Sequence, residues 1–214
     1  MATHPRIKLC GITRLDDAQL AVDAGAWAVG CILWPQSPRA CDPAEAGLIA
    51  SAVRRRAQVC GVFVNQHLDE ITELVDGLGL TMVQLHGDEG PAFCGEVARR
   101  TGAKVMKAAR VRTAADVQAL EAFHTDFHLL DAHLPGMRGG TGETFDWELV
   151  RTRRSNVPLV LSGGLTPGNV AEAIAVTAPF AVDTASGTES SPGIKDPAKV
   201  AAFVEAVQST AVPA

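Results

Sequence analysis

A cysteine near the start of the chain lies where a parallel α/β fold would carry chemistry. Cys10 is part of the apolar run over residues 7–12, and Gly11 and Thr13 break that run just before a helical pattern begins. In parallel α/β folds the carboxyl ends of the strands form the open cavity that holds the active site. A free cysteine is more often a small buried apolar side chain. Residue type alone therefore leaves two interpretations, a catalytic thiol or a core residue.

A carboxylate ends another apolar run, at Asp131 in Leu129-Leu130-Asp131. The side chain either caps a loop or faces a cavity, where partial burial would raise its pKa and suit it to acid catalysis. In a barrel of eight strands, Cys10 and Asp131 would lie across the mouth from each other. Two titratable groups on opposite sides of a substrate are what a proton-transferring isomerase requires.

Glycines follow the last two apolar runs of the chain. Gly163 and Gly164 come directly after Ser162, and Ser186 and Gly187 follow the final run. Glycines in these two loops allow backbone N–H groups to approach an anion closely. Ordinary turns are the alternative. Two such loops at adjacent strand ends favour a phosphate site.

Other polar side chains are expected around the same mouth. Arg39 lies in a long loop after the second run, where its planar guanidinium suits a carboxylate; a solvated surface arginine is the commoner case. Gln84 and His86 stand at the end of the fourth run, and His86 is expected to line the mouth. Lys8 should point to the same side as Cys10, because residues two apart on a strand share a face, and its charge would favour the thiolate.

The elements that must position these residues recur about every 25 residues, the length of one strand–helix unit. The pattern predicts an α/β fold, a single (β/α)8 TIM barrel over residues 1–214, with its catalytic face at the carboxyl ends of the strands. Thr13 is predicted to cap the first helix, with Gly25 after its end, and Asp196 to cap the last helix. The predicted strands are Ile7–Ile12, Trp27–Leu33, Gln58–Val64, Met82–Leu85, Lys104–Val111, Phe127–Asp131, Pro158–Ser162 and Ala181–Thr184.

Composition limits the classes of function. With 47% hydrophobic and 20% charged residues, the 214-residue chain has the composition of a globular protein. A net charge of −5 disfavours nucleic-acid and membrane partners and leaves room for a local basic pocket. Five unpaired cysteines and no signal-like start predict a cytoplasmic protein. No HExxH, CxxC, GxGxxG or GxxxxGK[ST] motif occurs, so no metal and no cofactor are expected.

Assembled in order, these motifs resemble the phosphoribosylanthranilate isomerase family of tryptophan biosynthesis. The resemblance implies a cofactor-free TIM barrel that converts N-(5-phosphoribosyl)anthranilate to 1-(2-carboxyphenylamino)-1-deoxyribulose 5-phosphate by an Amadori rearrangement. It implies that Cys10 is the general base and Asp131 the general acid, that Arg39 holds the anthranilate carboxylate, and that the glycine loops hold the phosphate. The segments that carry it are KLCGIT at 8–13, SPR at 37–39, GVFVN at 61–65, QLHGDE at 84–89, LLDA at 129–132, GGTGETFDW at 139–147, LSGGLTPGNV at 161–170 and SGTESSPGIKD at 186–196.

Asp183, at the end of the eighth run, also matches a family site position, without an assigned role. The chain departs from the family at Ala185, where a serine is common, so a hydroxyl contact to the phosphate is lost there. One alternative is the related aminoaldose isomerase of histidine biosynthesis, which resembles a duplicated half-barrel with an aspartate in place of Cys10. Another is a phosphate-binding barrel without catalysis. The resemblance leaves a monomer and a homodimer equally open.

Overall fold

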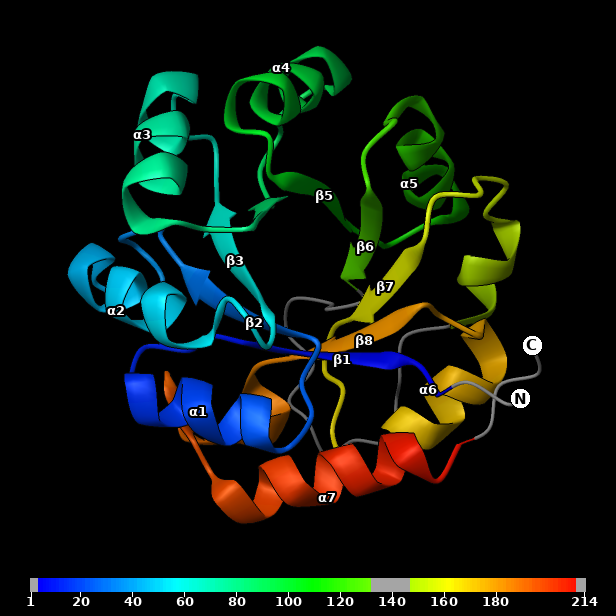
Figure 1. Cartoon of the computed structure of the whole chain (residues 1–214). Helices are drawn as coiled ribbons and strands as arrows, with labels where there is room; N and C mark the ends of the chain where they lie inside the picture. The colour runs from blue at the N-terminus through cyan, green and yellow to red at the C-terminus, as the bar shows by residue number, and fades with distance from the viewer. Residues whose placement is uncertain (1–3, 132–146, 211–214) are drawn as a thin grey trace.

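Eight parallel strands close into a barrel in the order of the sequence, so the predicted TIM barrel is confirmed. The computed structural model describes residues 4–131 and 147–210. Figure 1 shows the strands as a central ring with the helices outside it. The barrel strands are β1 Arg6–Cys10, β2 Ala28–Ile32, β3 Gln58–Phe63, β4 Met82–Leu85, β5 Lys104–Arg110, β6 Phe127–Asp131, β7 Leu159–Ser162 and β8 Ala181–Thr184.

All eight strands form where the apolar runs predicted them, and three of them, β4, β6 and β8, have the predicted bounds. Each of the other strands begins or ends one or two residues from the prediction. At β1 the reason is local: Gly11 has a φ of +73°, a conformation that leaves the extended region, so the strand stops at Cys10. Cys10 is therefore the last residue of its strand.

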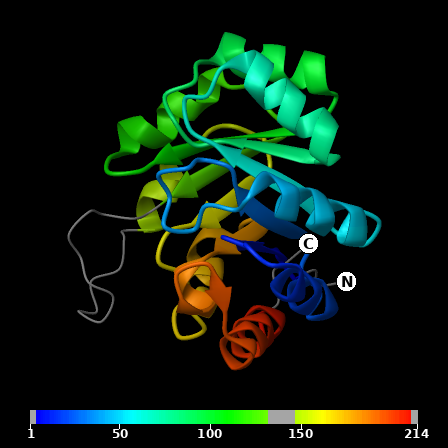
Figure 2. The same cartoon turned by 90° about the vertical axis from the view of Figure 1, so that its left-hand side faces the viewer.

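Helices cover the outer face of the barrel, as the turned view in Figure 2 also shows. Their apolar faces, together with the outward side chains of the strands, form the larger of two hydrophobic cores. The helices are α1 Leu15–Asp23, α2 Pro43–Val53, α3 Leu68–Leu78, α4 Pro91–Thr101, α5 Ala114–Ala119, α6 Val170–Thr177 and α7 Pro197–Gln208; short 3-10 turns are η1 Leu120–Ala122, η2 Trp147–Thr152 and η3 Ser186–Thr188.

The predicted helix caps had mixed outcomes. Asp196 caps α7, because its side chain accepts hydrogen bonds from the backbone N–H groups of Ala198 and Lys199. Gly25, with a φ of +92°, follows the end of α1 as predicted. The prediction for Thr13 is wrong: the residue that precedes α1 is Arg14, which makes no side-chain cap.

The hydroxyl of Thr13 is used elsewhere in the fold. Its Oγ1 donates to the carbonyl oxygen of Gly193 at 2.5 Å. Gly193 lies between two short antiparallel strands, β9 Glu189–Ser191 and β10 Ile194–Lys195, which follow the eighth barrel strand. This hydrogen bond joins the first strand–helix connection to the β9–β10 hairpin, so a tertiary partner replaced the local cap.

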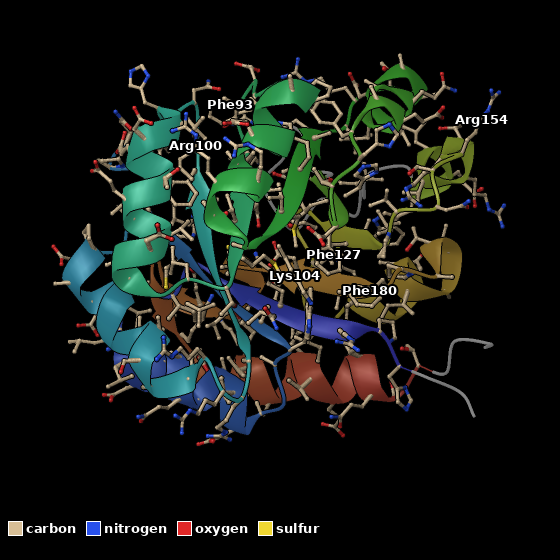
Figure 3. The ribbon with its side chains drawn as sticks, turned by 45° about the horizontal axis from the view of Figure 1, so that its top comes forward. Phe93, Arg100, Lys104, Phe127, Arg154 and Phe180 are labelled. Carbon is tan, nitrogen blue, oxygen red and sulfur yellow. The ribbon has the colours of Figure 1, made fainter. Side chains whose placement is uncertain are left out.

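The inside of the barrel is filled from its lower end, where the strands begin. Trp27, Phe127 and Phe180 form an aromatic cluster there, with ring centroids 5.2–5.4 Å apart. Figure 3 shows Phe127 and Phe180 together, with Lys104 near them. Above them lie buried apolar side chains, among them Met82, Met106 and Leu129, and Cys10 belongs to the same inner core. The packed interior leaves the carboxyl ends of the strands as the place for a site.

The ends of the described chain meet at the outside of the barrel, where the ring of His4 hydrogen-bonds to the backbone oxygen of Thr210. Helix α7 buries Val200, Phe203, Val204 and Val207 in the outer core. Within residues 4–131 and 147–210, no helix has the length and apolar character needed to cross a membrane.

The cap of α7 gives a test of the fold. Replacing Asp196 with alanine leaves two N–H groups of the first turn without their acceptor, so the free energy of unfolding should fall by about 1 kcal/mol. Asp196→Asn keeps a capping oxygen and is the matched control. Urea unfolding followed by circular dichroism measures both variants. An alanine variant as stable as the asparagine variant would show that the cap contributes nothing.

Candidate active site

A cavity of about 250 Å³ opens at the carboxyl ends of the barrel strands. It brings together nine of the ten predicted site residues, from six different strands or the loops after them. Gly187 is the exception, since it follows the lining residue Ser186 without lining the cavity itself. The lining consists of Cys10, Ile32, Arg39, Val62, Gln84, His86, Asp131, Ser162, Gly163, Gly164, Asp183, Thr184, Ala185 and Ser186.

A buried ion pair lies beneath the cavity. Lys8 is fully buried, and its Nζ donates to Oδ1 of Asp183 at 2.9 Å. The two residues are register partners on β1 and β8, so their side chains point to the same side of the sheet. Ser162 donates from Oγ to the second oxygen of Asp183 at 3.2 Å. Burial lowers the pKa of Lys8, but the charges of Asp183, Cys10 and Cys60 and the hydrogen bond to Asp183 together outweigh burial and raise that pKa overall, so Lys8 stays protonated.

The thiol of Cys10 lies beside this ammonium group. A Cβ atom placed on Gly30 of β2 would be 2.8 Å from Sγ of Cys10 and 3.2 Å from Nζ of Lys8, so both groups occupy the space that this glycine leaves open. The prediction that Lys8 and Cys10 share a face is confirmed. Burial raises the pKa of the Cys10 thiol, while the positive charges of Lys8 and Lys195 pull it down.

Asp131 belongs to a chain of three polar side chains on the other side of the cavity. Gln84 contacts Nδ1 of His86 through its Nε2 at 2.9 Å, and Nε2 of His86 lies 3.2 Å from Oδ2 of Asp131. With the amide of Gln84 as donor, the proton of His86 is on Nε2 and points at the carboxyl group. Asp131 is 20% exposed. Gln84 is buried; it lines the cavity and is linked to Asp131 through His86.

Arg39 is held by a buried glutamate that the sequence analysis assigned no role. Its Nε lies 2.9 Å from both carboxylate oxygens of Glu189, and Nη2 lies 2.8 Å from Oε2. The Glu189 side chain is 4% exposed and that of Arg39 is 23% exposed. The guanidinium is thus fixed along one edge, and Arg39 lines the cavity.

A second lysine joins Glu189 to Cys10. Nζ of Lys195 donates to the backbone oxygens of Cys10 at 2.7 Å and Ala185 at 3.0 Å, and it lies 3.5 Å from Oε1 of Glu189. Burial lowers the pKa of Lys195, and the charges of Glu189 and Cys10 oppose that shift. Lys195 connects the end of β1, the loop after β8 and the partner of Arg39.

The two glycine loops need glycine for different reasons. Gly163 and Gly164 have φ values of +97° and +64°, which favour glycine. A Cβ on Gly187 would lie 2.0 Å from the backbone oxygen of Leu165, so the loops pack too closely for any side chain there. A Cβ on Gly164 would meet nothing within 4 Å. The close packing holds η3 against the loop after β7, both at the cavity.

A larger cavity of about 410 Å³ lies next to this one, between the ends of β4 and β5 and helix α5. It shares His86 with the first cavity and contains a buried ion pair, Lys107 Nζ to Glu89 Oε2 at 2.8 Å. Cys10 and Asp131 do not line it. We therefore place the chemistry in the smaller cavity, where the thiol and the carboxyl group are.

Three residues of the site were not singled out from the sequence: Gly30, Glu189 and Lys195. The segment 186–196 contains the last two, but only the folded hairpin shows which partners they meet. Two of the segments that carry the resemblance, LLDA at 129–132 and GGTGETFDW at 139–147, lie in part outside the described residues. In the described part of the chain, no group of three His, Cys, Asp or Glu side chains could hold a metal ion.

Comparison with known proteins agrees with this geometry. The family model described as N-(5'phosphoribosyl)anthranilate (PRA) isomerase matches residues 7–206. An N-(5'-phosphoribosyl)anthranilate isomerase of Citrifermentans bemidjiense is 46% identical over 97% of this chain and 98% of its own length. The crystal structure of phosphoribosyl anthranilate isomerase from Thermotoga maritima has a TM-score of 0.86 at 38% identity and covers 96% of this chain and 100% of its own.

A further crystal structure similar to this chain is of phosphoribosyl anthranilate isomerase in complex with reduced 1-(o-carboxyphenylamino)-1-deoxyribulose 5-phosphate. It has a TM-score of 0.82 at 37% identity and covers 96% of this chain and 100% of its own. That ligand carries a carboxylate at one end and a phosphate at the other.

The charge of Lys8 can be tested on the thiol directly. Lys8→Met removes the ammonium beside Cys10 and leaves the thiol buried, so the pKa of the thiol should rise. Because only the thiolate reacts, the pH profile of Cys10 alkylation by iodoacetamide, followed by peptide mass spectrometry, should move to higher pH. Lys104→Met, at the lower end of the barrel, is the control. An unchanged profile in a folded Lys8→Met protein would refute this role for Lys8.

Proposed function

The chain belongs to the N-(5'-phosphoribosyl)anthranilate isomerase family and is an aldose–ketose isomerase of tryptophan biosynthesis, and we propose that Cys10 and Asp131 are its general base and general acid. One observation carries this assignment. The thiol of Cys10 and the carboxyl group of Asp131, which lie on different strands, line the same small cavity. The thiol also lies beside the buried ammonium of Lys8. Arg39 and two glycine loops line the same cavity.

The charged groups of the substrate match two kinds of donor at the cavity, the backbone N–H groups of the glycine loops and the guanidinium of Arg39. We assign the phosphate to the loops after β7 and β8, where Gly163, Gly164, Ser186 and Gly187 offer backbone N–H groups. In the described residues, these four N–H groups donate to no backbone oxygen. The carboxylate of the anthranilate ring is assigned to the end of the Arg39 guanidinium, because two N–H groups there match two carboxylate oxygens. The ribose carbons then lie between Cys10 and Asp131.

The first step is the opening of the furanose ring. Asp131 gives its proton to the ring oxygen, the bond from that oxygen to carbon 1 breaks, and the nitrogen lone pair forms a C=N bond. The product is a protonated Schiff base with an open sugar chain. His86, whose Nε2 faces Oδ2 of Asp131, helps to hold the carboxyl group at the cavity.

The second step is the removal of a proton from carbon 2. The Cys10 thiolate takes this proton, the electron pair forms a double bond between carbons 1 and 2, and the C=N pair returns to nitrogen. The resulting enolamine gains a proton at carbon 1 and loses one from the hydroxyl of carbon 2, which gives the aminoketose. The ammonium of Lys8 favours the charged form of the base throughout. We propose further that the reaction needs neither metal nor cofactor and takes place in the cytoplasm, in a monomer or homodimer.

Asp183 and Gln84 support these groups from below the cavity. Asp183 neutralises Lys8 and keeps its ammonium in place, and Gln84 fixes the ring of His86. The loss of a serine hydroxyl at Ala185 is offset in part by Lys195, which binds the backbone oxygen of that residue and so holds the loop. The phosphate site accordingly depends on backbone donors.

Turnover tests the assignment of acid and base. Freshly generated N-(5-phosphoribosyl)anthranilate is supplied to the enzyme, and its product is consumed by coupled indole-glycerol-phosphate synthase. The unmodified protein should turn over, while Cys10→Ser and Asp131→Asn should each lower kcat by roughly a hundredfold to ten-thousandfold, since each removes one proton transfer. KM should change less than kcat.

Matched controls separate chemistry from folding. Cys94→Ser changes a buried thiol on α4, and Asp69→Asn changes an exposed carboxylate on α3, both away from the cavity. Both controls should keep their activity. If the unmodified protein is inactive but still binds the reduced product, the result would favour one of the two alternatives, isomerisation of the histidine-pathway substrate or binding without catalysis. Active Cys10→Ser and Asp131→Asn variants would refute the assigned roles.

A further inference from the structure

A buried glutamate outside the predicted set of site residues, Glu189, contacts the guanidinium of Arg39. Its carboxylate accepts from Nε and Nη2 of Arg39 and from the backbone N–H of Gly193 at 3.4 Å, and it lies 3.5 Å from the ammonium of Lys195. Four donors therefore surround Glu189, which is 4% exposed. Because donors surround it, the carboxylate of Glu189 is held in one orientation.

The contacts use up one edge of the guanidinium. A guanidinium group has two faces for a bidentate carboxylate, the edge formed by Nε with one terminal nitrogen and the end formed by the two terminal nitrogens. Glu189 occupies the Nε–Nη2 edge. The end with Nη1 and Nη2 is left to meet a ligand, and Arg39 lines the 250 Å³ cavity.

The pair rests on the backbone next to Cys10. A Cβ atom on Gly11 would lie 2.9 Å from Cδ of Arg39 and 3.1 Å from Oε1 of Glu189, so the ion pair packs directly over that residue. On the other side, Lys195 contacts Glu189 and donates to the backbone oxygen of Cys10. The orientation of Arg39 and the position of Cys10 are thus set by one cluster.

The charges of the cluster also favour an anion at this place. Arg39 and Lys195 carry two positive charges, and Glu189 carries one negative charge. Lys195 directs its N–H groups at backbone oxygens and at Glu189, so the uncompensated positive charge is on the cavity side, at Arg39. A ligand carboxylate would neutralise it.

We propose that Glu189 is a positioning residue that selects substrates with a ring carboxylate, by turning the Nη1–Nη2 end of Arg39 toward the cavity at a fixed distance from Cys10. This inference rests on the proposed function and deepens it. Without Glu189, Arg39 keeps its charge but loses the contact that orients it. The selection should then weaken while the proton transfers at Cys10 and Asp131 remain.

Two ligands that differ only in the carboxylate measure this selection. They are the reduced product, 1-(o-carboxyphenylamino)-1-deoxyribulose 5-phosphate, and its analogue with an unsubstituted phenyl ring, titrated by calorimetry. Glu189→Gln should weaken binding of the first ligand by about tenfold to a hundredfold, the effect of a lost charged hydrogen bond. Binding of the second should change less than about threefold, and KM for the substrate should rise more than kcat falls.

Glu96→Gln is the matched control, since Glu96 is also paired with arginine, but on the exposed surface of α4. It should bind both ligands as the unmodified protein does. In the double variant Arg39→Ala with Glu189→Gln, the loss for the carboxylated ligand should equal that of Arg39→Ala alone. If Glu189→Gln does not fold, Glu189→Asp keeps the charge, draws Arg39 away from the cavity and is tested in the same way.

The outcomes separate this inference from the proposed function. Equal losses for both ligands, or an additive effect in the double variant, would show that Glu189 only supports the fold and would overturn the inference. An unmodified protein that binds both ligands equally would overturn it too, because Arg39 would then not bind the carboxylate. Absence of turnover in the unmodified protein overturns the proposed function by itself.

Discussion

The site depends on one buried charge, the ammonium of Lys8 inside the barrel. An unpaired ammonium in such a place is costly, so it must meet a carboxylate. Asp183 supplies one only because β1 and β8 pair and close the barrel, with Lys8 and Asp183 as register partners. Once Lys8 is held, the alternation of side chains along β1 places Cys10 beside it at the strand end. The same pairing of β1 with β8 therefore closes the barrel and fixes the ammonium of Lys8 beside Cys10.

The proposed mechanism assigns the two proton transfers to different strands of the barrel, β1 and β6. The base on β1 is surrounded by fixed charges, the ammonium groups of Lys8 and Lys195, yet burial still dominates and raises its pKa. The proposed acid on β6 is oriented by the contacts that run from Gln84 through His86. In the proposed binding mode, backbone N–H groups of the glycine loops bind the phosphate and Arg39 binds the carboxylate. Binding and proton transfer use separate groups.

The sequence predicted what depends on periodicity and on residue type at strand ends. The spacing of the apolar runs predicted all eight strands, and it placed Cys10, Asp131 and the glycines on one face. The spacing of the apolar runs could not predict contacts between segments that are distant along the chain. The partner of Arg39 lies 150 residues away along the chain, and Thr13 failed as a cap because its hydroxyl binds a carbonyl of the β9–β10 hairpin. The direction of the pKa shift at Cys10 likewise follows from burial, which only the packed structure shows.

A crystal structure with the reduced product bound tests the central claim most directly. The 250 Å³ cavity and the neighbouring 410 Å³ cavity are two alternative places for the ligand, and their linings share only His86. The account predicts the phosphate at the loops of Gly163 and Ser186, the carboxylate on the end of Arg39, and carbon 2 next to Sγ of Cys10 with Asp131 across the sugar chain. A ligand bound in the 410 Å³ cavity against α5, or with its phosphate at Arg39, would contradict it.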